Sequence, residues 1–239
     1  MASSGTAKGI SCNIIWYDET DSTNTEAARR LDELDNMSVI AARCQTAGRG
    51  KGSRKWAAAP GENLTFTAVL KYSGRAGDSV TARERVWPPF PASCQMLLSA
   101  AAAASVVEFL SGLGISSWVK WPNDVYVGGG KICGILIEHR TSGTLLKASI
   151  IGIGININQT VFPPELVNPV SVAALTGRKY AVEPLLERFC GIFREKMLSV
   201  YRELPHLGDV IAGVLASEDG AAGDENVRAC FSECVNVLL

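Results

Sequence analysis

The eleven residues from Thr46 to Trp56 combine three glycines, four basic side chains and an aromatic ring, with no acidic residue among them. Glycine lets the backbone approach a ligand closely and tolerates positive φ. Successive backbone N–H groups in such a turn surround an anion, and the guanidinium groups of Arg49 and Arg54 offer paired donors to phosphate or carboxylate oxygens. This loop predicts a site for a small phosphate-bearing anion and not only a solvated basic turn.

Three later segments carry further polar groups. In Lys120-Trp-Pro-Asn-Asp124, the side chains of Asn123 and Asp124 suit a ribose, a base edge or hydrated Mg²⁺, although a plain Asn-Asp turn is commoner. Lys131 follows three glycines and can stabilise charge developing on phosphorus or a carbonyl oxygen, or it is a surface lysine at a strand end. Gly152-Ile-Gly-Ile-Asn156 ends in an amide that can reach a triphosphate.

Several classes of site are excluded by pattern. The glycine-rich loop is neither the G-x-G-x-x-G fingerprint nor a P-loop. The two histidines have no partners at metal-ligand spacing and support no Ser-His-Asp arrangement. The formal net charge of −1 gives the chain as a whole no nucleic-acid-binding character.

The elements that must position these residues form an α+β fold, a mixed sheet flanked by helices. Alternating or continuous apolar runs predict strands at 12–17, 38–44, 63–70, 117–121, 125–127, 131–138 and 145–157. Helices are expected after the Asp-Ser-Thr-Asn cap through Leu34, at 93–110 and at 182–202. Residues 72–91 form an exposed excursion. We expect a catalytic domain over 1–205 and a short, degenerate β-type appendage over 206–239.

Length and cysteine content limit the number of domains and the compartment. The 239 residues suit one large domain, or one domain with a small appendage. Seven cysteines, an odd number without a secretory segment, predict a reduced compartment and a cytoplasmic location, with mitochondrial import left open. No run reaches the ~20 apolar residues of a membrane span, so no membrane partner is expected.

Five segments in this order resemble the catalytic domain of the biotin–protein ligases, also called biotin–[acetyl-CoA-carboxylase] ligases. They are Asp21-Ser-Thr-Asn24, Gln45 with Gly48-Arg-Gly50 and Arg54-Lys-Trp56, Lys120-Trp-Pro-Asn-Asp124, Lys131 with Gly134 and Glu138, and Gly152-Ile-Gly-Ile-Asn156. The resemblance implies a class II synthetase-like fold that uses MgATP to convert biotin to biotinyl-5′-AMP. It then implies transfer to a lysine of a biotin carboxyl carrier domain. We expect no preceding DNA-binding segment and no DNA partner.

Carried over by position, the resemblance implies two adjoining sites and a catalytic group. The biotin site would comprise Ser22, Thr23, Asn24, Gln45, Arg49, Gly50, Lys51, Lys131 and Gly134. The ATP site would comprise Arg49, Lys51, Arg54, Trp56, Lys120, Asn123, Asp124, Lys131 and Asn156. The catalytic residues would be Lys131, Arg54 and Asp124, with Asp124 a candidate base and the neighbour of any Mg²⁺ that enters with ATP.

The sequence departs from the family pattern at two places, and two other functions remain open. Lys51 stands where the family commonly has a second arginine, so the charge is kept but the bidentate fork is lost. The stretch after Leu207 is short for the family's C-terminal barrel. One alternative is a lipoate– or octanoate–protein ligase of the same fold, which would make poor use of the polar Ser-Thr-Asn. The other is a non-catalytic relative that binds biotin.

Overall fold

The computed structural model describes residues 12–73, 86–216 and 221–239. Its strands are β1 (Asn13–Thr20), β2 (Ser38–Gln45), β3 (Leu64–Lys71), β4 (Phe90–Pro91), β5 (Trp118–Lys120), β6 (Asp124–Val127), β7 (Gly130–Ser142) and β8 (Leu145–Ile155). Its helices are α1 (Thr23–Arg29), the 3₁₀ turn η1 (Ala92–Cys94), α2 (Met96–Ser111), α3 (Val172–Thr176), α4 (Val182–Ala216) and α5 (Ala221–Leu238). The predicted α+β fold is confirmed.

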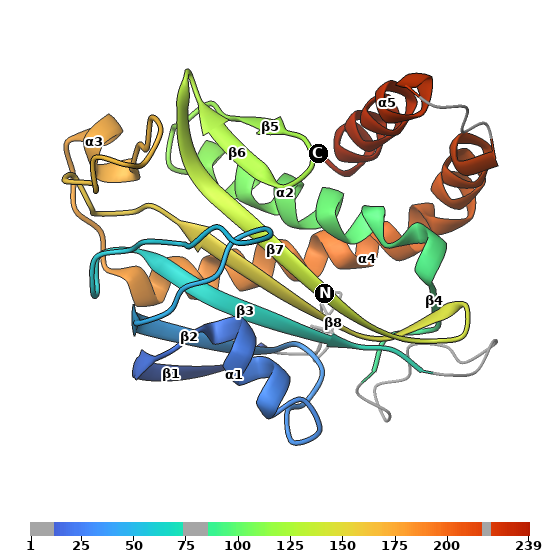
Figure 1. Cartoon of the computed structure of the whole chain (residues 1–239), viewed down its shortest axis with the longest axis horizontal. Coiled ribbons are helices and arrows are strands. Elements are labelled where there is room, and N and C mark those ends of the chain that lie inside the picture. Colours follow the sequence, from blue (N-terminus) through green and yellow to red (C-terminus); the bar gives the residue numbers. More distant parts are fainter. Residues whose placement is uncertain (1–11, 74–85, 217–220) are drawn as a thin grey trace, which may run out of the picture.

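The strands of the described residues form one sheet with the order β1-β2-β3-β8-β7-β6-β5 (Figure 1). The short strand β4 pairs with Leu145 and Leu146 at the start of β8. Strands β1 and β2 run parallel and the remaining pairs are antiparallel. The parallel pair is joined through α1, as a parallel connection requires a crossover. The sheet is therefore mixed, as the alternation of strands and helices in the sequence predicts.

The two faces of the sheet differ in polarity, as the alternating residues of strand β3 show. Phe66 and its apolar neighbours at every second position belong to the core cluster under α2 and α4, and the Phe66 ring meets that of Phe189 edge-on at 5.1 Å between centroids. Thr65 and Thr67 point to the opposite face. This second face is polar or glycine-lined over much of its length, which leaves room for a ligand.

Helix α2 is the central core helix. Its apolar residues are buried nearly all round, because it packs between the sheet, α4 and α5. The segment Ala92–Ser111 is long and apolar enough to cross a membrane, contrary to the expectation that no segment is, but 67% of its most apolar window is buried inside the protein. The apolar composition of this segment is explained by its burial in the core.

The predicted β-type character of residues 206–239 is wrong. Helix α4 continues to Ala216, and α5 follows it over Ala221–Leu238. The buried residues of α5 fall at spacings of one, three and four, which is a helical stripe and not a strand alternation. They are Cys230, Phe231, Cys234, Val235 and Leu238. The division into two domains stays a prediction.

Other differences are local. Helix α1 ends at Arg29, short of the expected Leu34. Of the predicted 72–91 excursion, residues 74–85 lie outside the described residues, while Trp87 and Phe90 are buried in the core. All seven cysteines are free thiols, as expected.

Candidate active site

A cavity of about 620 Å³ opens on the face of the sheet that α2 and α4 do not cover. Its lining contains every residue that the sequence predicts for the site. These residues are Ser22, Thr23, Asn24, Gln45, Arg49, Gly50, Lys51, Arg54, Trp56, Lys120, Asn123, Asp124, Lys131, Gly134 and Asn156. The fold thus brings together positions spread over some 135 residues of sequence, and their individual roles stay predictions.

The first turn of α1 forms one end of the cavity, and a side chain from β2 caps this helix. Ser22 is the N-cap residue but its side chain makes no capping hydrogen bond. The backbone N–H of Thr23 instead donates to Oε1 of Gln45 at 2.8 Å, and the Thr23 hydroxyl donates to the same oxygen at 3.1 Å. Gln45 at the end of β2 therefore satisfies one of the free backbone N–H groups at the start of α1. This contact fixes the buried Ser22 and Thr23 at this end of the cavity.

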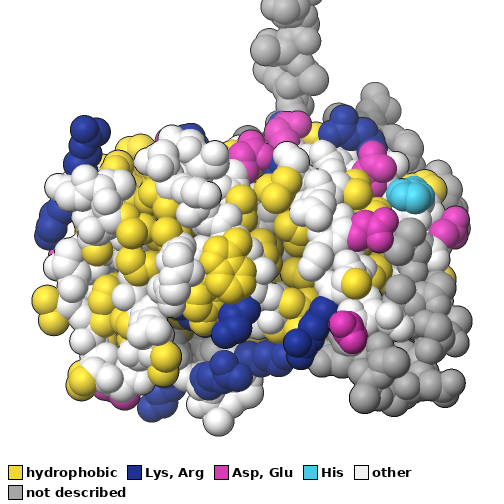
Figure 2. Space-filling view, turned by 90° about the horizontal axis from the view of Figure 1, so that it is seen from above, with side chains coloured by type: hydrophobic (Ala, Val, Ile, Leu, Met, Phe, Trp, Pro, Cys, Tyr) yellow, Lys and Arg dark blue, Asp and Glu magenta, His cyan; other side chains and the backbone are white. Residues whose placement is uncertain are grey.

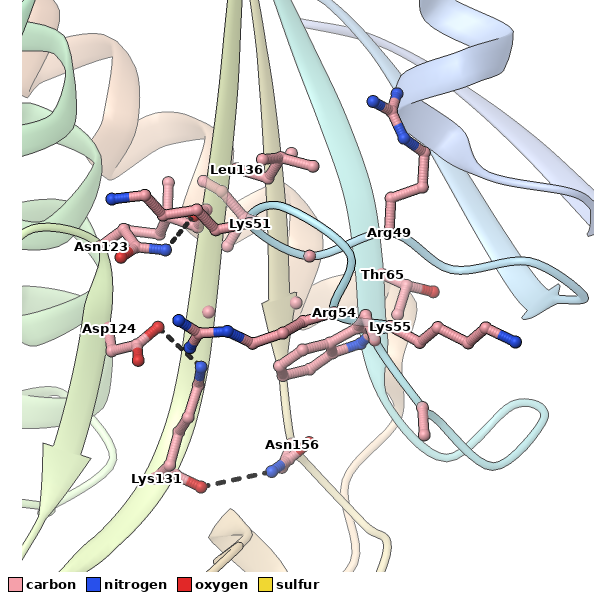
Figure 3. Close-up of a pocket in the computed structure, with 18 of the residues that line it drawn as sticks. Arg49, Lys51, Arg54, Lys55, Thr65, Asn123, Asp124, Lys131, Leu136 and Asn156 are labelled. Atoms are coloured by element: carbon pink, nitrogen blue, oxygen red, sulfur yellow. Dashed lines mark hydrogen bonds and ion pairs between the residues drawn. The ribbon is translucent and has the colours of Figure 1, made fainter. Parts of the chain in front are cut away.

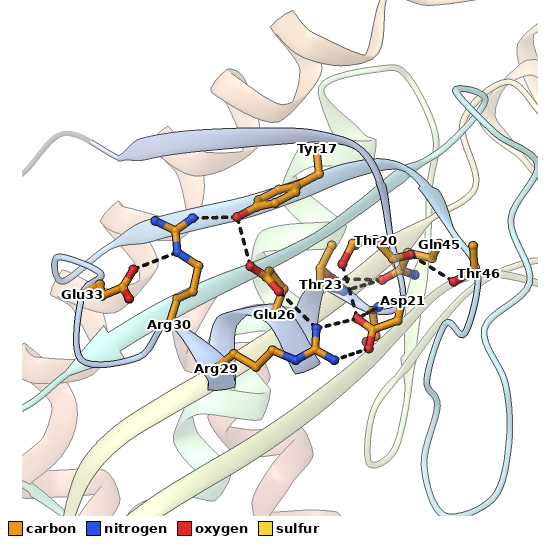
Figure 4. A network of polar contacts seen from close by, with 11 residues as sticks. Tyr17, Thr20, Asp21, Thr23, Glu26, Arg29, Arg30, Glu33, Gln45 and Thr46 are labelled. Carbon is orange, nitrogen blue, oxygen red and sulfur yellow. Dashed lines mark hydrogen bonds and ion pairs between the residues drawn. The ribbon is translucent and has the colours of Figure 1, made fainter.

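Charged residues on the outer side of α1 hold the same turn in place (Figure 4). Asp21 accepts a hydrogen bond from the Ser22 backbone at 2.7 Å and forms an ion pair with Arg29. The hydrogen bond from Arg29 and that from the Ser22 backbone lower the pKa of Asp21. Tyr17 donates to Glu26 at 3.1 Å and accepts from Arg30 at 2.6 Å. The network ties α1 to β1 without entering the cavity.

Asn24 lies on the sheet itself. Its amide nitrogen donates to Glu138 at 3.0 Å, and its oxygen accepts from the Thr67 hydroxyl at 2.7 Å. The side chain fits only because Gly152 lies beneath it, where an added Cβ would be 2.0 Å from the Asn24 oxygen. Asn24 is only 3% exposed. It is thus a rigid polar group at the floor of the cavity.

Arg49 and Glu138 form a bidentate ion pair at 2.8 and 2.9 Å. Burial raises the pKa of Glu138, but hydrogen bonds from Arg49 and Asn24 outweigh this effect and lower the pKa. The pair anchors the glycine-rich loop to β7. Arg49 consequently points away from Asp124 and Lys131 (Figure 3).

The glycine-rich loop closes on itself as a small hairpin. The Gly50 N–H donates to the Arg54 carbonyl at 2.8 Å, and the Trp56 N–H donates to the Gly48 carbonyl at 3.0 Å. A Cβ on Gly48 would be 2.3 Å from the Trp56 carbonyl oxygen, so this position requires glycine. The hairpin brings the basic residues of the loop over the cavity while its backbone remains close to the sheet.

The Trp56 ring lies flat on a strip of glycine in β7 and β8. An added Cβ on Gly154 would be 2.3 Å from the indole ring, and one on Gly134 would be 3.1 Å away. The indole N–H is buried and has no hydrogen-bond partner among the described residues. Buried indole N–H groups ordinarily find a partner, so a bound ligand is a natural acceptor for this donor.

The basic end of the cavity is built around an ion pair between Lys131 and Asp124, whose nitrogen and oxygen are 2.7 Å apart. Asn123, beside Asp124, holds the start of β6 to β7 by donating to the Ile135 carbonyl at 2.9 Å. Arg54 extends from the glycine-rich loop toward the ion pair (Figure 3). Two cations, Lys131 and Arg54, and the Asp124 carboxylate therefore converge on the same part of the cavity.

A second loop that sequence reasoning did not find contributes Glu165, Leu166, Val167 and Pro169 to the lining. The backbone N–H of Lys131 donates to the Asn168 carbonyl at 2.8 Å, which holds this loop beside the cavity. The predicted residue Asn156 has a related role, because its amide donates to the Val170 carbonyl at 3.0 Å. A surface loop of Pro and Val carries no chemical motif, so only the fold reveals it.

The charge of the site is local. Figure 2 shows Lys and Arg side chains gathered in a row on one face of the molecule, although the formal net charge of the chain is −1. The carboxylates in the cavity lining are Asp124 and Glu165. Within the described parts of the chain, no group of three His, Cys, Asp or Glu residues is placed to hold a metal ion.

Comparison with known proteins shows the family of the chain. Residues 16–156, more than half of the chain, match the biotin/lipoate A/B protein ligase family. The chain is 34% identical over 169 residues to the biotin–[acetyl-CoA-carboxylase] ligase of Paracoccus denitrificans, and this match covers 69% of the chain and 64% of that protein. It is 32% identical over 172 residues to the bifunctional ligase/repressor BirA of Bacillus subtilis, covering 70% of the chain and 48% of that protein.

The chain thus spans about half to two thirds of the length of these relatives. Among solved structures, the biotin protein ligase from Aquifex aeolicus in complex with biotin and ATP is similar with a TM-score of 0.60 and 28% identity, over 79% of this chain and 71% of that one. The matched segment contains both ends of the cavity described above. The chain belongs to the biotin/lipoate A/B protein ligase family.

Proposed function

We propose that the chain is a biotin–protein ligase. It would convert biotin and MgATP to biotinyl-5′-AMP and pyrophosphate, and then transfer the biotinyl group to one lysine of a biotin carboxyl carrier domain. The names of the relatives and the biotin- and ATP-bound Aquifex structure support this activity. The acceptor by the same reasoning belongs to a biotin-dependent carboxylase such as acetyl-CoA carboxylase.

The observation that carries the proposal is the joining of two unlike ends in one cavity. One end, around Thr23 and Asn24, is neutral, polar and held rigid by hydrogen bonds. The other end contains Lys131 and Arg54. A ligand with an uncharged hydrogen-bonding head and a carboxylate tail matches this order, because its head reaches the first end and its acid reaches the second. Biotin, with a ureido ring and a valerate chain, has these groups.

The same order favours biotin over octanoate or lipoate. An aliphatic tail has no donors or acceptors, so it would leave the polar groups at the Asn24 end without ligand partners. Asn24 and Thr23 also contact Thr67, Gln45 and Glu138, so the polarity of this end is shared by several elements.

Adenylate formation brings a carboxylate to the α-phosphate of ATP, and both are anions. A biotin carboxylate oxygen forms a bond to the α-phosphorus, and the bond to the bridging oxygen of pyrophosphate breaks. Lys131 and Arg54 lie where they would offset the repulsion between the two reactants. In the structure Lys131 is paired with Asp124 at 2.7 Å. Arrival of the α-phosphate would therefore exchange one anionic partner of Lys131 for another.

Mg²⁺ fits this site as a companion of ATP. Mg²⁺ commonly binds one or two carboxylates together with substrate phosphates and waters. Asp124 and Glu165 are the available carboxylates, and no three-ligand group occurs among the residues that the structure describes. When bound, the ion would neutralise phosphate charge, and Asp124 and Glu165 are the carboxylates of the lining that would hold it.

Transfer requires a neutral acceptor amine, whereas a free lysine with a pKa of about 10.4 is mostly protonated at pH 7. The amine attacks the carbonyl carbon of the adenylate, AMP leaves, and the amine loses a proton. Asp124 is a candidate base for that proton. If Asp124→Asn leaves transfer from preformed biotinyl-5′-AMP unchanged, this role is wrong and Asp124 serves to hold Lys131.

The decisive experiment is biotin-dependent exchange of labelled pyrophosphate into ATP, with octanoate and lipoate as parallel acids. We expect exchange with biotin alone, lost in Lys131→Ala and retained in Lys147→Ala. Lys147 is the matched control because it is an exposed lysine of the same sheet outside the cavity lining. Exchange with octanoate or lipoate instead would assign the chain to lipoate-type chemistry. Biotin binding without exchange would indicate a non-catalytic relative.

A further inference from the structure

The C-terminal helix α5 is firmly attached to the rest of the molecule. Its apolar stripe is buried against α2 and α4. Lys196 of α4, itself buried, donates to the Leu238 carbonyl at 2.6 Å and forms an ion pair with Glu108 of α2 at the same distance. One cation thus joins the end of α5 to both neighbouring helices, and its charge is compensated by two acceptors.

Helix α5 contacts a loop beside the cavity through the ring of Trp121. The loop from Trp121 to Asn123 joins β5 to β6, and Asn123 and Asp124 line the cavity. Trp121 does not line it but packs against the core cluster on the other side of the loop. The guanidinium group of Arg228 on α5 lies over the Trp121 ring, 5.3 Å from its centroid. Figure 1 shows the C-terminal end of α5 near β5 and β6.

We propose that Arg228 is a positioning residue for the nucleotide end of the cavity, acting through Trp121. The loop has three residues between two strands, so a shift of Trp121 displaces Asn123 and Asp124 with it. Asp124 in turn holds Lys131. Helix α5 would thereby set the position of the groups that meet the phosphates, although none of its described side chains lines the cavity.

The inference rests on the proposed function for its main readout. In pyrophosphate exchange by the full chain, Arg228→Ala should raise the KM for ATP by roughly two- to five-fold, the factor expected from an exposed cation–π contact. The KM for biotin should rise less than that for ATP, because only the carboxylate of biotin meets Lys131, while its head binds at the Asn24 end. Arg228→Lys should recover most of the loss, since a lysine keeps the cation over the ring.

Two further variants separate positioning from general weakening of the fold. Arg202→Ala, which removes an exposed arginine from α4, should leave both KM values unchanged. In a Trp121→Leu background, Arg228→Ala should have no additional effect on the KM for ATP. An unchanged KM for ATP in Arg228→Ala, equal rises in both KM values, or an undiminished effect in the Trp121→Leu background would each overturn the inference.

Failure of the proposed function is distinguishable from failure of this inference. If the unmodified chain shows no exchange with any acid, the same variants are compared by calorimetric titration with ATP. A two- to five-fold weaker Kd in Arg228→Ala and recovery in Arg228→Lys would still support the positioning role. Identical Kd values across the series would refute it.

Discussion

The substitution Gly152→Ala tests the geometry of the cavity floor most directly. The added Cβ would be 2.0 Å from Oδ1 of Asn24 and 2.8 Å from its Cγ. An ordinary contact is about 3.4 Å, so the Asn24 oxygen must move by about 1.4 Å. Asn24 is short and 3% exposed, and it cannot rotate into solvent as a long surface side chain would.

The cost follows from the bonds that Asn24 makes. A displacement of this size breaks its 2.7 Å hydrogen bond with Thr67 and disturbs the 3.0 Å bond to Glu138. Each such bond contributes about 0.5–1.5 kcal/mol, and overpacking of a rigid site costs about 1–3 kcal/mol. We expect Gly152→Ala to lower the free energy of unfolding by about 1–3 kcal/mol.

The effect on biotin should exceed the effect on ATP. Loss of one or two ligand hydrogen bonds near Asn24, at about 1.4 kcal/mol per factor of ten, predicts a KM for biotin that is roughly ten-fold higher or more. The KM for ATP should change less than two-fold, because the three atoms nearest to the added Cβ all belong to Asn24 and none belongs to Lys131, Arg54 or Asp124. Both constants come from pyrophosphate exchange, and urea denaturation gives the stability.

Gly191→Ala is the matched control. This glycine is in α4, and an added Cβ would meet nothing within 4 Å. Alanine is favoured over glycine in a helix by about 0.5–1 kcal/mol, so this variant should be slightly more stable with unchanged kinetics. If Gly152→Ala binds biotin as well as the unmodified chain, the assignment of the Asn24 end to biotin is wrong.

Three more outcomes are expected. Gly154→Ala should displace Trp56 and raise the KM for ATP more than that for biotin, the reverse of Gly152→Ala; equal KM changes would contradict the placement of Trp56 near the nucleotide. Lys51→Arg should restore a bidentate donor and slow the escape of biotinyl-5′-AMP several-fold, measured by loss of labelled adenylate on gel filtration; an unchanged rate would remove Lys51 from the adenylate site. The pKa of Glu138 is lowered, so its stabilising charge is fully present above its ordinary value of 4.5 and is lost as the pH falls through the lowered pKa. The stability difference from Glu138→Gln should therefore be constant from pH 6 to 8 and shrink below about pH 4.5; a difference that persists in acid would show that charge is not its cause.

Strands were the most predictable elements because one continuously apolar face leaves a two-residue pattern of residue type, as at Leu64, Phe66 and Ala68 in β3, a strand that is buried on both faces. Strand β7 is longer than predicted, continuing to Ser142. Its last residues are exposed and polar, and only pairing with β8 keeps them extended. Periodicity reports burial, so it gives no signal where a strand leaves the core.

Helix α5 was missed for a different reason. Its moderate hydrophobicity and its β-branched and aromatic residues, such as Val235 and Phe231, favoured a weak strand. The buried positions are nevertheless spaced as one face of a helix. A count of helical spacing over residues 230–238 would have found it.

For the candidate site, the polar residues were predictable and the surfaces that seat them were not. The sequence motifs predicted Asn24, Trp56 and Lys131 as site residues, and all three line one cavity. The pairing of Asn24 with Gly152 and of Trp56 with Gly154 depends on strand register and on loop paths. Those contacts join residues about one hundred or more positions apart, and a single sequence carries no distance between them.

The glycine strip formed by Gly134, Gly152 and Gly154 limits how this cavity can change over evolutionary time. Its floor is main chain, and hydrogen bonding to strands on both sides fixes the height of that main chain. No substitution can deepen such a floor, because every other amino acid adds atoms to it. New ligand specificity must therefore arise from the side chains around the strip, such as Asn24 and Trp56, because the strip itself cannot become smaller.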